Sequence, residues 1–318
     1  MGFLAELLFT LFWAISLSLA LLFVGARMLC VGLVIDPAEM IHARLDASFI
    51  ARTLLANLVV VPAIALALVW AVPLPTEVVL GVLLVAALPG GIEFLPLAIK
   101  PRAASRDVMA LVFLLSLVAV AITPGIRLTL ELFGALPVAS YGRLLAVAVL
   151  AVLLPLISGL VIRRAFPATA DTLAPAMAIV APVLFVAAAL TTFVVKVEAV
   201  RAIGVRGLAV MILVVAGAAG AGWLLGGRSS SRRAVLAHVT RMRNAGLGLV
   251  VAIVSFPQTG VDVVVLVFVV VELTVRLVAR LGRRGRGRTP GPSSRGHELE
   301  TSGSAVAGGP RSCVPESD

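Results

Sequence analysis

Long apolar stretches recur along this chain from its start to about residue 281, and they restrict the folds that it can adopt. A helix of roughly 20 apolar residues crosses the hydrocarbon core of a bilayer. The stretch 145–162 is apolar on every side, whereas a strand of a membrane β-barrel alternates polar and apolar residues over about ten positions. The pattern therefore predicts an all-α polytopic membrane protein.

The composition agrees with this prediction. Hydrophobic residues make up 61% of the 318 residues and charged residues 13%, which is too few to cover a water-soluble domain. The net charge of +10 comes largely from arginines near helix ends and in the C-terminal tail, where they set orientation or contact anionic lipid. No basic face with interleaved aromatic residues indicates a nucleic-acid partner. Cys30 and Cys313 suit neither a disulfide framework nor a metal site.

We predict about nine membrane segments, with inverted halves at about 1–135 and 140–281. The approximate segments are 3–35, 48–71, 76–99 (broken), 107–133, 141–165, 174–197, 204–227, 232–255 (broken) and 261–281. Residues 1–281 would form the membrane domain. Residues 282–318 are rich in Arg, Gly, Pro and Ser, which predicts a disordered tail.

The distribution of Lys and Arg predicts the orientation in the inner membrane. If the helices alternate, most of these residues fall on one side, and two turns on the other side, 72–76 and 256–260, hold none. Cytoplasmic loops carry the excess of positive charge. We therefore expect the N-terminus outside, the C-terminal tail in the cytoplasm, and an odd number of helices.

Two predicted segments contain residues that oppose a continuous helix. The third contains Leu88-Pro89-Gly90-Gly91, and the eighth contains the stretch from Arg241 to Gly248. Proline removes a backbone donor, and glycine lowers the cost of unwinding. Unwound backbone at membrane depth is tolerated only where it lines a cavity or packs on protein. Paired interruptions in two halves indicate the binding site of a secondary transporter.

Further short motifs surround these interruptions. They are Gly32-Leu33-Val34-Ile35-Asp36-Pro37, Asn57, Pro62, Pro89-Gly90-Gly91, Arg106-Asp107-Val108, Thr123-Pro124, Pro155, Gly159 and Arg243-Asn244-Ala245-Gly246-Leu247. Over residues 20–281, the chain resembles the bile acid:sodium symporter (sodium/bile-acid cotransporter-like) family. The resemblance implies a panel domain and a core domain in which two broken helices cross. It also implies a ten-helix plan of two inverted repeats, here without the first helix, and transport of organic anions with sodium.

The chain departs from the family pattern where sodium would bind. Residues 92–95, after the first PGG motif, are Ile-Glu-Phe-Leu instead of small polar residues. Leu111 and Leu115 replace Ser and Thr oxygens, and Val239 and Arg243 stand where the resemblance implies Glu and Gln. A guanidinium repels sodium where an oxygen should bind it. The usual sodium sites are therefore expected to be missing, which puts sodium coupling in question, and we predict no other cofactor.

Polar and special residues near the breaks are the candidates for function. Those for the substrate or ion pathway are Asn57, Pro89, Gly90, Gly91, Glu93, Ser116, Arg241, Arg243 and Asn244, and those for proton coupling are His238 and Glu272. Charges inside a bilayer are kept when they are paired or useful. Glu93 paired with one arginine across the crossing would replace a bound cation, and the other arginine would receive a carboxylate or sulfate of the substrate.

Simpler interpretations stand beside these. Arg241 can extend to the lipid headgroups, and Asn57 can hydrogen-bond across helices or line a cavity. Glu272 and Arg276 have the spacing of an intrahelical ion pair, which is favoured over a proton relay. A single histidine such as His238 is more often packed than titrating.

The sequence thus predicts a secondary transporter of small organic anions. The alternative is a sensor-like or degenerate membrane protein that does not transport, because the expected ion ligands are missing. Clustered aspartates, a His-Glu-x-x-His motif and a Gly-x-Ser-x-Gly element are all absent from the sequence. We therefore predict no enzymatic activity and no catalytic residues. The oligomeric state does not follow from the sequence.

Overall fold

The computed structural model of the chain describes residues 2–36, 46–90, 103–132 and 139–286. The chain divides between Arg276 and Leu277 into two units, and the first unit contains the features analysed below. The predicted boundary of the membrane domain after residue 281 is not tested by this division and stays a prediction.

The described residues are almost entirely helical, which confirms the all-α prediction. The elements are α1 (Gly2–Val34), α3 (Ala47–Leu55), the π-helical turn η1 (Ala56–Val60), α4 (Val61–Ala71), α5 (Thr76–Ala87), α6 (Ala103–Leu132), α7 (Tyr141–Ala148), the π-helical turn η2 (Val149–Leu153), α8 (Leu154–Ala165), α9 (Pro167–Val195), α10 (Val197–Leu225), α11 (Ser230–Arg241), α12 (Ala245–Ser255) and α13 (Val261–Arg286). Within this part of the chain, 6 continuous helical stretches are long and apolar enough to cross a membrane. The protein is therefore a polytopic membrane protein, while the count of nine segments and the inverted halves stay predictions.

Two helices begin earlier than the sequence suggested. Helix α9 begins at Pro167 rather than near 174, because proline is well suited to the first turn, where its missing N–H has no intrahelical role. Helix α10 begins at Val197, and the predicted start near 204 is instead a kink. Gly204 has φ of 59° at that point, a conformation that glycine adopts at little cost.

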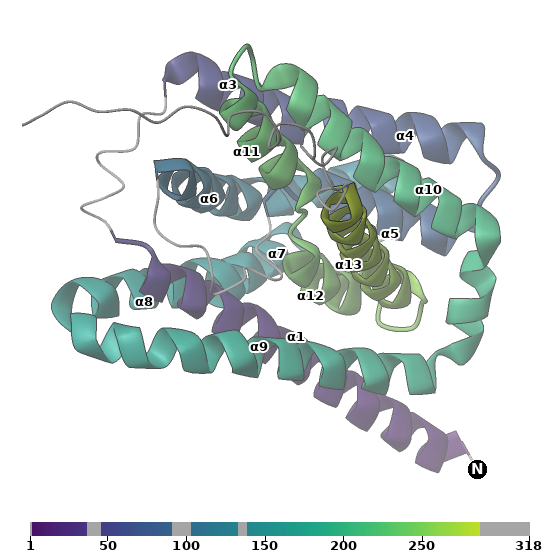
Figure 1. Ribbon diagram of the computed structural model, residues 1–318. Coiled ribbons are helices and arrows are strands. Elements are labelled where there is room, and N and C mark those ends of the chain that lie inside the picture. Colours follow the sequence, from purple (N-terminus) through teal and green to yellow (C-terminus); the bar gives the residue numbers. More distant parts are fainter. Residues whose placement is uncertain (1, 37–45, 91–102, 133–138, 287–318) are drawn as a thin grey trace, which may run out of the picture. The chain divides into compact units, whose positions relative to one another are not determined.

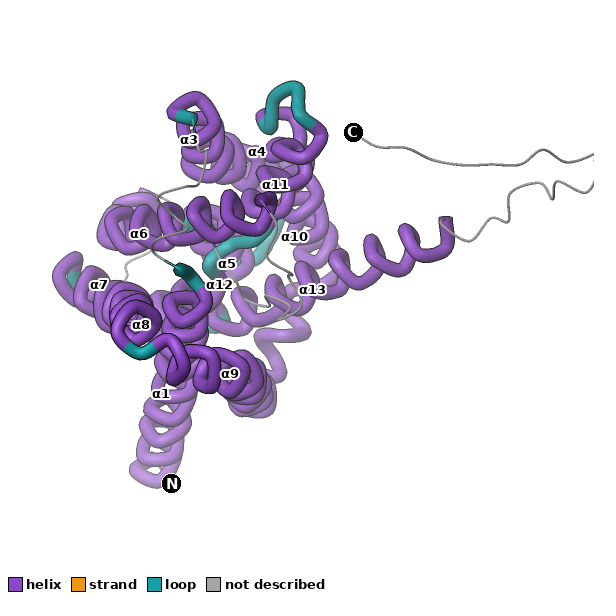
Figure 2. The backbone as a smooth tube through the Cα atoms, turned by 60° about the vertical axis from the view of Figure 1, so that its left-hand side comes forward, coloured by secondary structure: helices purple, strands orange, loops and turns teal. Residues whose placement is uncertain are grey.

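The helices of the first unit pack in two groups. Helix α1 lies along α9 and α8, while α10 packs against α4 and α11 (Figure 1). The same separation is seen in Figure 2, where α1, α8 and α9 lie together below α3, α4 and α11. We call α1, α7–η2–α8 and α9 the flanking group, and we call α3 to α6 with α10, α11, α12 and α13 up to Arg276 the crossing group. Contacts of α1 with α12 and of α6 with α7 join them.

One face of α9 is apolar and exposed along its length. Its large exposed side chains recur every three or four residues: Ile179, Val183, Val186, Leu190 and Val194. This period keeps all of them on one side of a helix. An apolar stripe of this kind is unfavourable in water and is the expected surface of a helix that faces lipid.

Polar contacts gather at the helix ends. Asp46 caps α3 by accepting a hydrogen bond from Phe49 N at 2.7 Å, and Arg232 of α11 pairs with it at 2.7 Å. Hydrogen bonds from Arg232, from the Phe49 N–H and from Ser48 lower the pKa of Asp46 to about 2. The carboxylate therefore stays charged at neutral pH, and this contact holds the start of α3 beside α11.

Helices α1 and α8 approach most closely at two glycines. A Cβ atom on Gly159 would lie 2.5 Å from Leu29 O and 2.8 Å from Gly32 Cα, and one on Gly32 would lie 2.3 Å from Leu156 O. These neighbours are backbone atoms, which cannot move aside as a side chain can. Small residues at such points let two membrane helices pack backbone to backbone.

We expect Gly159→Ala to destabilise the protein, because the added methyl group forces α1 and α8 apart at an over-packing cost of about 1–3 kcal/mol. Thermal unfolding of the purified protein in detergent measures the effect. Gly220→Ala on α10 is the matched control, because a Cβ atom there meets no neighbour within 4 Å. Equal melting temperatures for the two variants would contradict the close contact.

Candidate functional site

The first helix break follows α5. The helix ends at Ala87, Leu88 is extended with φ −90° and ψ 104°, and Gly90 has φ of +62°. A Cβ atom on Gly90 would also lie 2.4 Å from Leu115 Cβ on α6. Both the backbone conformation and the space therefore require glycine here. Gly91 and Glu93 lie outside the described residues.

The second break separates α11 from α12. It is shorter than the sequence suggested, because Met242 is extended (φ −78°, ψ 108°) and the chain is helical again from Ala245. The Asn244 side chain caps α12, since its Oδ1 accepts a hydrogen bond from Leu247 N at 3.1 Å. Such a cap satisfies a free donor of the first turn and favours an immediate restart of the helix.

The two breaks meet. Pro89 and Arg243 form an antiparallel β-bridge, and Asn244 N donates to Leu88 O at 3.3 Å. The backbone groups that unwinding leaves without helical partners are thus partly satisfied across the crossing, as a low-dielectric environment demands. The structure places Pro89, Gly90, Arg243 and Asn244, all candidates from the sequence, at one point.

The Arg243 side chain is the central group of this crossing. It is 1% exposed and makes four hydrogen bonds: Nε to Val85 O at 3.3 Å, Nη1 to Asn57 Oδ1 at 2.9 Å, and Nη2 to Asn57 O at 3.3 Å and to Ala86 O. Val85 and Ala86 are in the last turn of α5, where carbonyls carry partial negative charge, and Val85 O also accepts a hydrogen bond from Leu88 N at 3.2 Å. The guanidinium therefore serves as a cationic cap for a helix that ends inside the membrane.

Asn57 reaches Arg243 from the π-helical turn η1. A π turn shifts the hydrogen-bonding register by one residue, and the Asn57 carbonyl accepts from Arg243 as well as its side chain. Its Nδ2 donates to Thr53 O at 2.9 Å and to Thr240 Oγ1 at 3.4 Å. Asn57 thus hydrogen-bonds across helices, and it joins η1 and α11 to the crossing.

Other charged side chains lie near this point. Glu272 and Arg276 on α13 form the ion pair that their spacing predicted, and Glu272 also interacts electrostatically with Arg241 and Arg243. Glu272 is 1% exposed and Arg276 7%. We call Arg241, Arg243, Glu272 and Arg276 the charge cluster. Counting described residues alone, it contains three guanidinium groups and one carboxylate, so the formal charge of these four side chains is positive.

The remaining candidates take less central places. Ser116 is buried and donates to Val112 O of its own helix at 2.8 Å. His238 is partly buried in the last turn of α11. Leu111 and Leu115 pack with Val235, Leu236, Val239 and Phe49 in an apolar cluster.

The expected pair between Glu93 and an arginine stays a prediction, because Glu93 is outside the described residues. Sequence reasoning missed the carbonyls of Val85 and Ala86, since any residue has a carbonyl.

A helix that ends inside the bundle against the break of a second, interrupted helix, with buried charges where they meet, is an arrangement typical of membrane carriers. The model of the sodium bile acid symporter family matches residues 19–217, more than half of the chain, and the protein belongs to this family. Its members are membrane transporters. The match includes the first break but ends before the second. A search among curated proteins finds no match.

We expect Glu272→Gln to destabilise the protein more than Arg276→Gln, because it removes the carboxylate that pairs with Arg276 and attracts Arg241 and Arg243. Breaking a buried ion pair by removing one partner costs about 3–5 kcal/mol. The double variant should recover part of the loss, since it also removes one excess positive charge. A thermal unfolding series of the four proteins measures this, and strictly additive losses would show that the two residues do not interact.

Proposed function

We propose that the protein is a secondary transporter of small organic anions across the inner membrane, and that it does not bind sodium at the crossing. The observation that carries this proposal is the position of Arg243, whose guanidinium is held by four oxygen acceptors where the two breaks meet. Two separate consequences follow from this position, one for the substrate and one for the coupling ion.

The substrate class follows from the local electrostatics. The charge cluster has more guanidinium groups than carboxylates, and charge of one sign in a low-dielectric site attracts the opposite sign. Helix α12 begins at the crossing, so the partial positive charge of its N-terminus adds to this field. The buried Nδ2 of Asn244 finds no acceptor among the described residues. An anionic oxygen at the crossing would supply one.

The coupling ion follows from the oxygen groups. Backbone carbonyls and amide oxygens are ligands for a hard cation, but here Val85 O, Ala86 O and both oxygens of Asn57 accept from Arg243. The positions expected to add further oxygens hold Leu111, Leu115 and Val239, which are fully or almost fully buried in an apolar cluster. We infer that the tethered guanidinium takes the place of a bound cation.

A measurement of solute flux distinguishes a carrier from a non-transporting sensor. Purified protein in proteoliposomes should take up at least one labelled organic anion from a panel down its gradient, and replacing sodium by choline should leave the initial rate unchanged. Strong sodium dependence would contradict the inferred role of Arg243. Saturable binding of an anion without flux would favour the sensor. A response of the flux to a pH step would implicate His238 or Glu272 in proton coupling.

We expect Arg243→Met to reduce uptake by about tenfold or more, because a single unpaired buried carbonyl costs about 1–3 kcal/mol. Millimolar guanidinium ion added to the variant should restore part of the rate by occupying the vacated oxygens. Arg201→Met, which alters an exposed ion pair with Glu198, is the control and should transport normally. Full activity of Arg243→Met would refute the proposed role.

We also propose the membrane orientation that the positive charges favour, with the N-terminus outside and residues 282–318 in the cytoplasm. Arg163, which donates to Leu33 O and pairs with Asp171, and Arg232, which pairs with Asp46, would then lie at the cytoplasmic ends of their helices. A protease added to inverted membrane vesicles should remove the C-terminal tail, whereas the same protease added to intact spheroplasts should leave it.

A further inference from the structure

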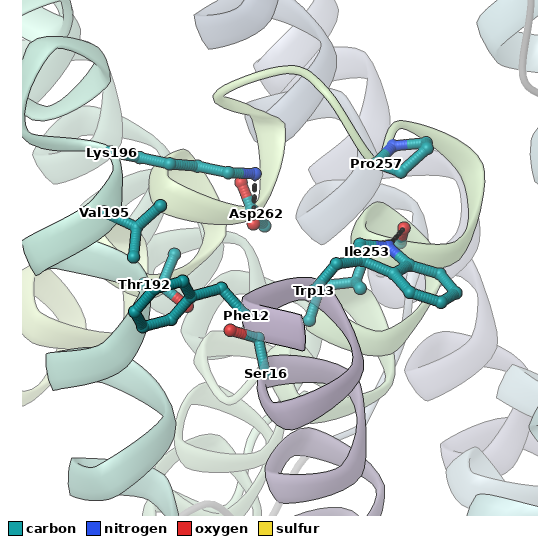
Figure 3. A pocket seen from close by; sticks show the side chains of 9 residues that line it. All are labelled: Phe12, Trp13, Ser16, Thr192, Val195, Lys196, Ile253, Pro257 and Asp262. Atoms are coloured by element: carbon teal, nitrogen blue, oxygen red, sulfur yellow. Dashed lines mark hydrogen bonds and ion pairs between the residues drawn. The ribbon is translucent and has the colours of Figure 1, made fainter. Parts of the chain in front are cut away.

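A pocket lies between the flanking and crossing groups, away from the crossing. Its walls include Phe12, Trp13 and Ser16 of α1, Thr192 and Lys196 at the end of α9, and Asp262 at the start of α13 (Figure 3). The cavity itself is small, about 20 Å³, which is room for about one water molecule. No residue of this pocket was a candidate in the sequence.

An ion pair lies across this pocket. Lys196 Nζ is 2.7 Å from Asp262 Oδ2, as the dashed line in Figure 3 shows, and it also donates to Thr259 O at 2.7 Å. The Asp262 side chain is 4% exposed and that of Lys196 19%. Lys196 is the non-helical residue between α9 and α10, while Thr259 and Asp262 lie at the turn into α13. The pair therefore joins two helix corners.

A second contact lies beside the ion pair. The Trp13 indole Nε1 donates to Ile253 O at 3.2 Å, which joins α1 to the last turns of α12. Helix α12 begins at the crossing and ends at this pocket, and Ala245 and Ile253 are about 12 Å apart along its axis, at about 1.5 Å per residue. The pocket thus lies where the two groups meet, at the opposite end of α12 from the crossing.

Resting on the transport function proposed above, we propose that the ion pair between Lys196 and Asp262 is a gate between the flanking and crossing groups, and that it must open for a solute to pass between them toward the crossing from this end. A buried ion pair suits the purpose. Much of its attraction is offset by the desolvation of the two charges, so that separating them into water costs only a modest free energy. An apolar plug of the same size would resist hydration far more. The Trp13 contact closes the neighbouring gap.

The test measures access to the pocket, so it needs no substrate. In the full chain with Cys30→Ala and Cys313→Ser, Ser16→Cys reports on the pocket through its reaction with a membrane-impermeant maleimide. Adding Asp262→Asn should raise the labelling rate about tenfold, the change that about 1.4 kcal/mol of lost attraction produces. Lys196→Met should act in the same direction. The exchanged pair, Lys196→Asp with Asp262→Lys, should restore slow labelling.

Two controls make the result decisive. Glu198→Cys, at a side chain that is 81% exposed, should react rapidly in every background, and Arg201→Gln should leave the Ser16→Cys rate unchanged. Melting temperatures exclude unfolding as the cause of faster labelling. Rapid Ser16→Cys labelling in the otherwise native protein, or no acceleration by either gate variant, would overturn the proposal. Labelling of intact cells and of inverted vesicles shows on which side of the membrane the gate lies. Absence of anion flux in proteoliposomes would refute the proposed transport function, but it would leave the labelling result unchanged.

Discussion

The hydrogen bonds of Arg243 are the interaction on which the arrangement of the site depends. Helix α5 ends within the bundle, and its last carbonyls need donors that neither water nor lipid can supply. Leu88 N donates to Val85 O, and the guanidinium of Arg243 donates to Val85 O and to Ala86 O and joins η1 to the same point. The Pro89 bridge and the Asn244 cap then fix the two breaks against each other. A stable unwound centre inside the protein is the condition for a central binding site.

The same interaction connects structure with mechanism. A carrier that binds its coupling cation reversibly can use an ion gradient, whereas a tethered guanidinium supplies the positive charge permanently. In our proposal the Arg243 guanidinium provides the positive charge that a bound cation would provide at the crossing. Transport is then not coupled to a gradient of that cation. Transport would then follow the gradient of the anion itself, unless His238 or Glu272 adds a proton. Access would be controlled separately, at the ion pair of Lys196 and Asp262.

Much of the fold was predictable, because apolar length and helix-breaking residues act locally. The all-helical class, the points where α5 and α11 end, and the ion pair of Glu272 with Arg276 follow from such patterns. The partners of Arg243 did not, because three of its four acceptors are backbone carbonyls that no residue type marks. The sequence suggested an acidic partner in Glu93, which lies outside the described residues. The pocket was missed because its residues come from α1, the end of α9, the end of α12 and the start of α13, and only tertiary packing brings them together.

The most direct test of the central claim is a high-resolution electron cryo-microscopy map of the protein in lipid nanodiscs with sodium present. The account predicts density for the Arg243 guanidinium between Asn57 and the carbonyls of Val85 and Ala86, with no ion at these oxygens. An ion bound there, with the Arg243 side chain turned away, would contradict it. So would two uninterrupted helices in place of the crossing.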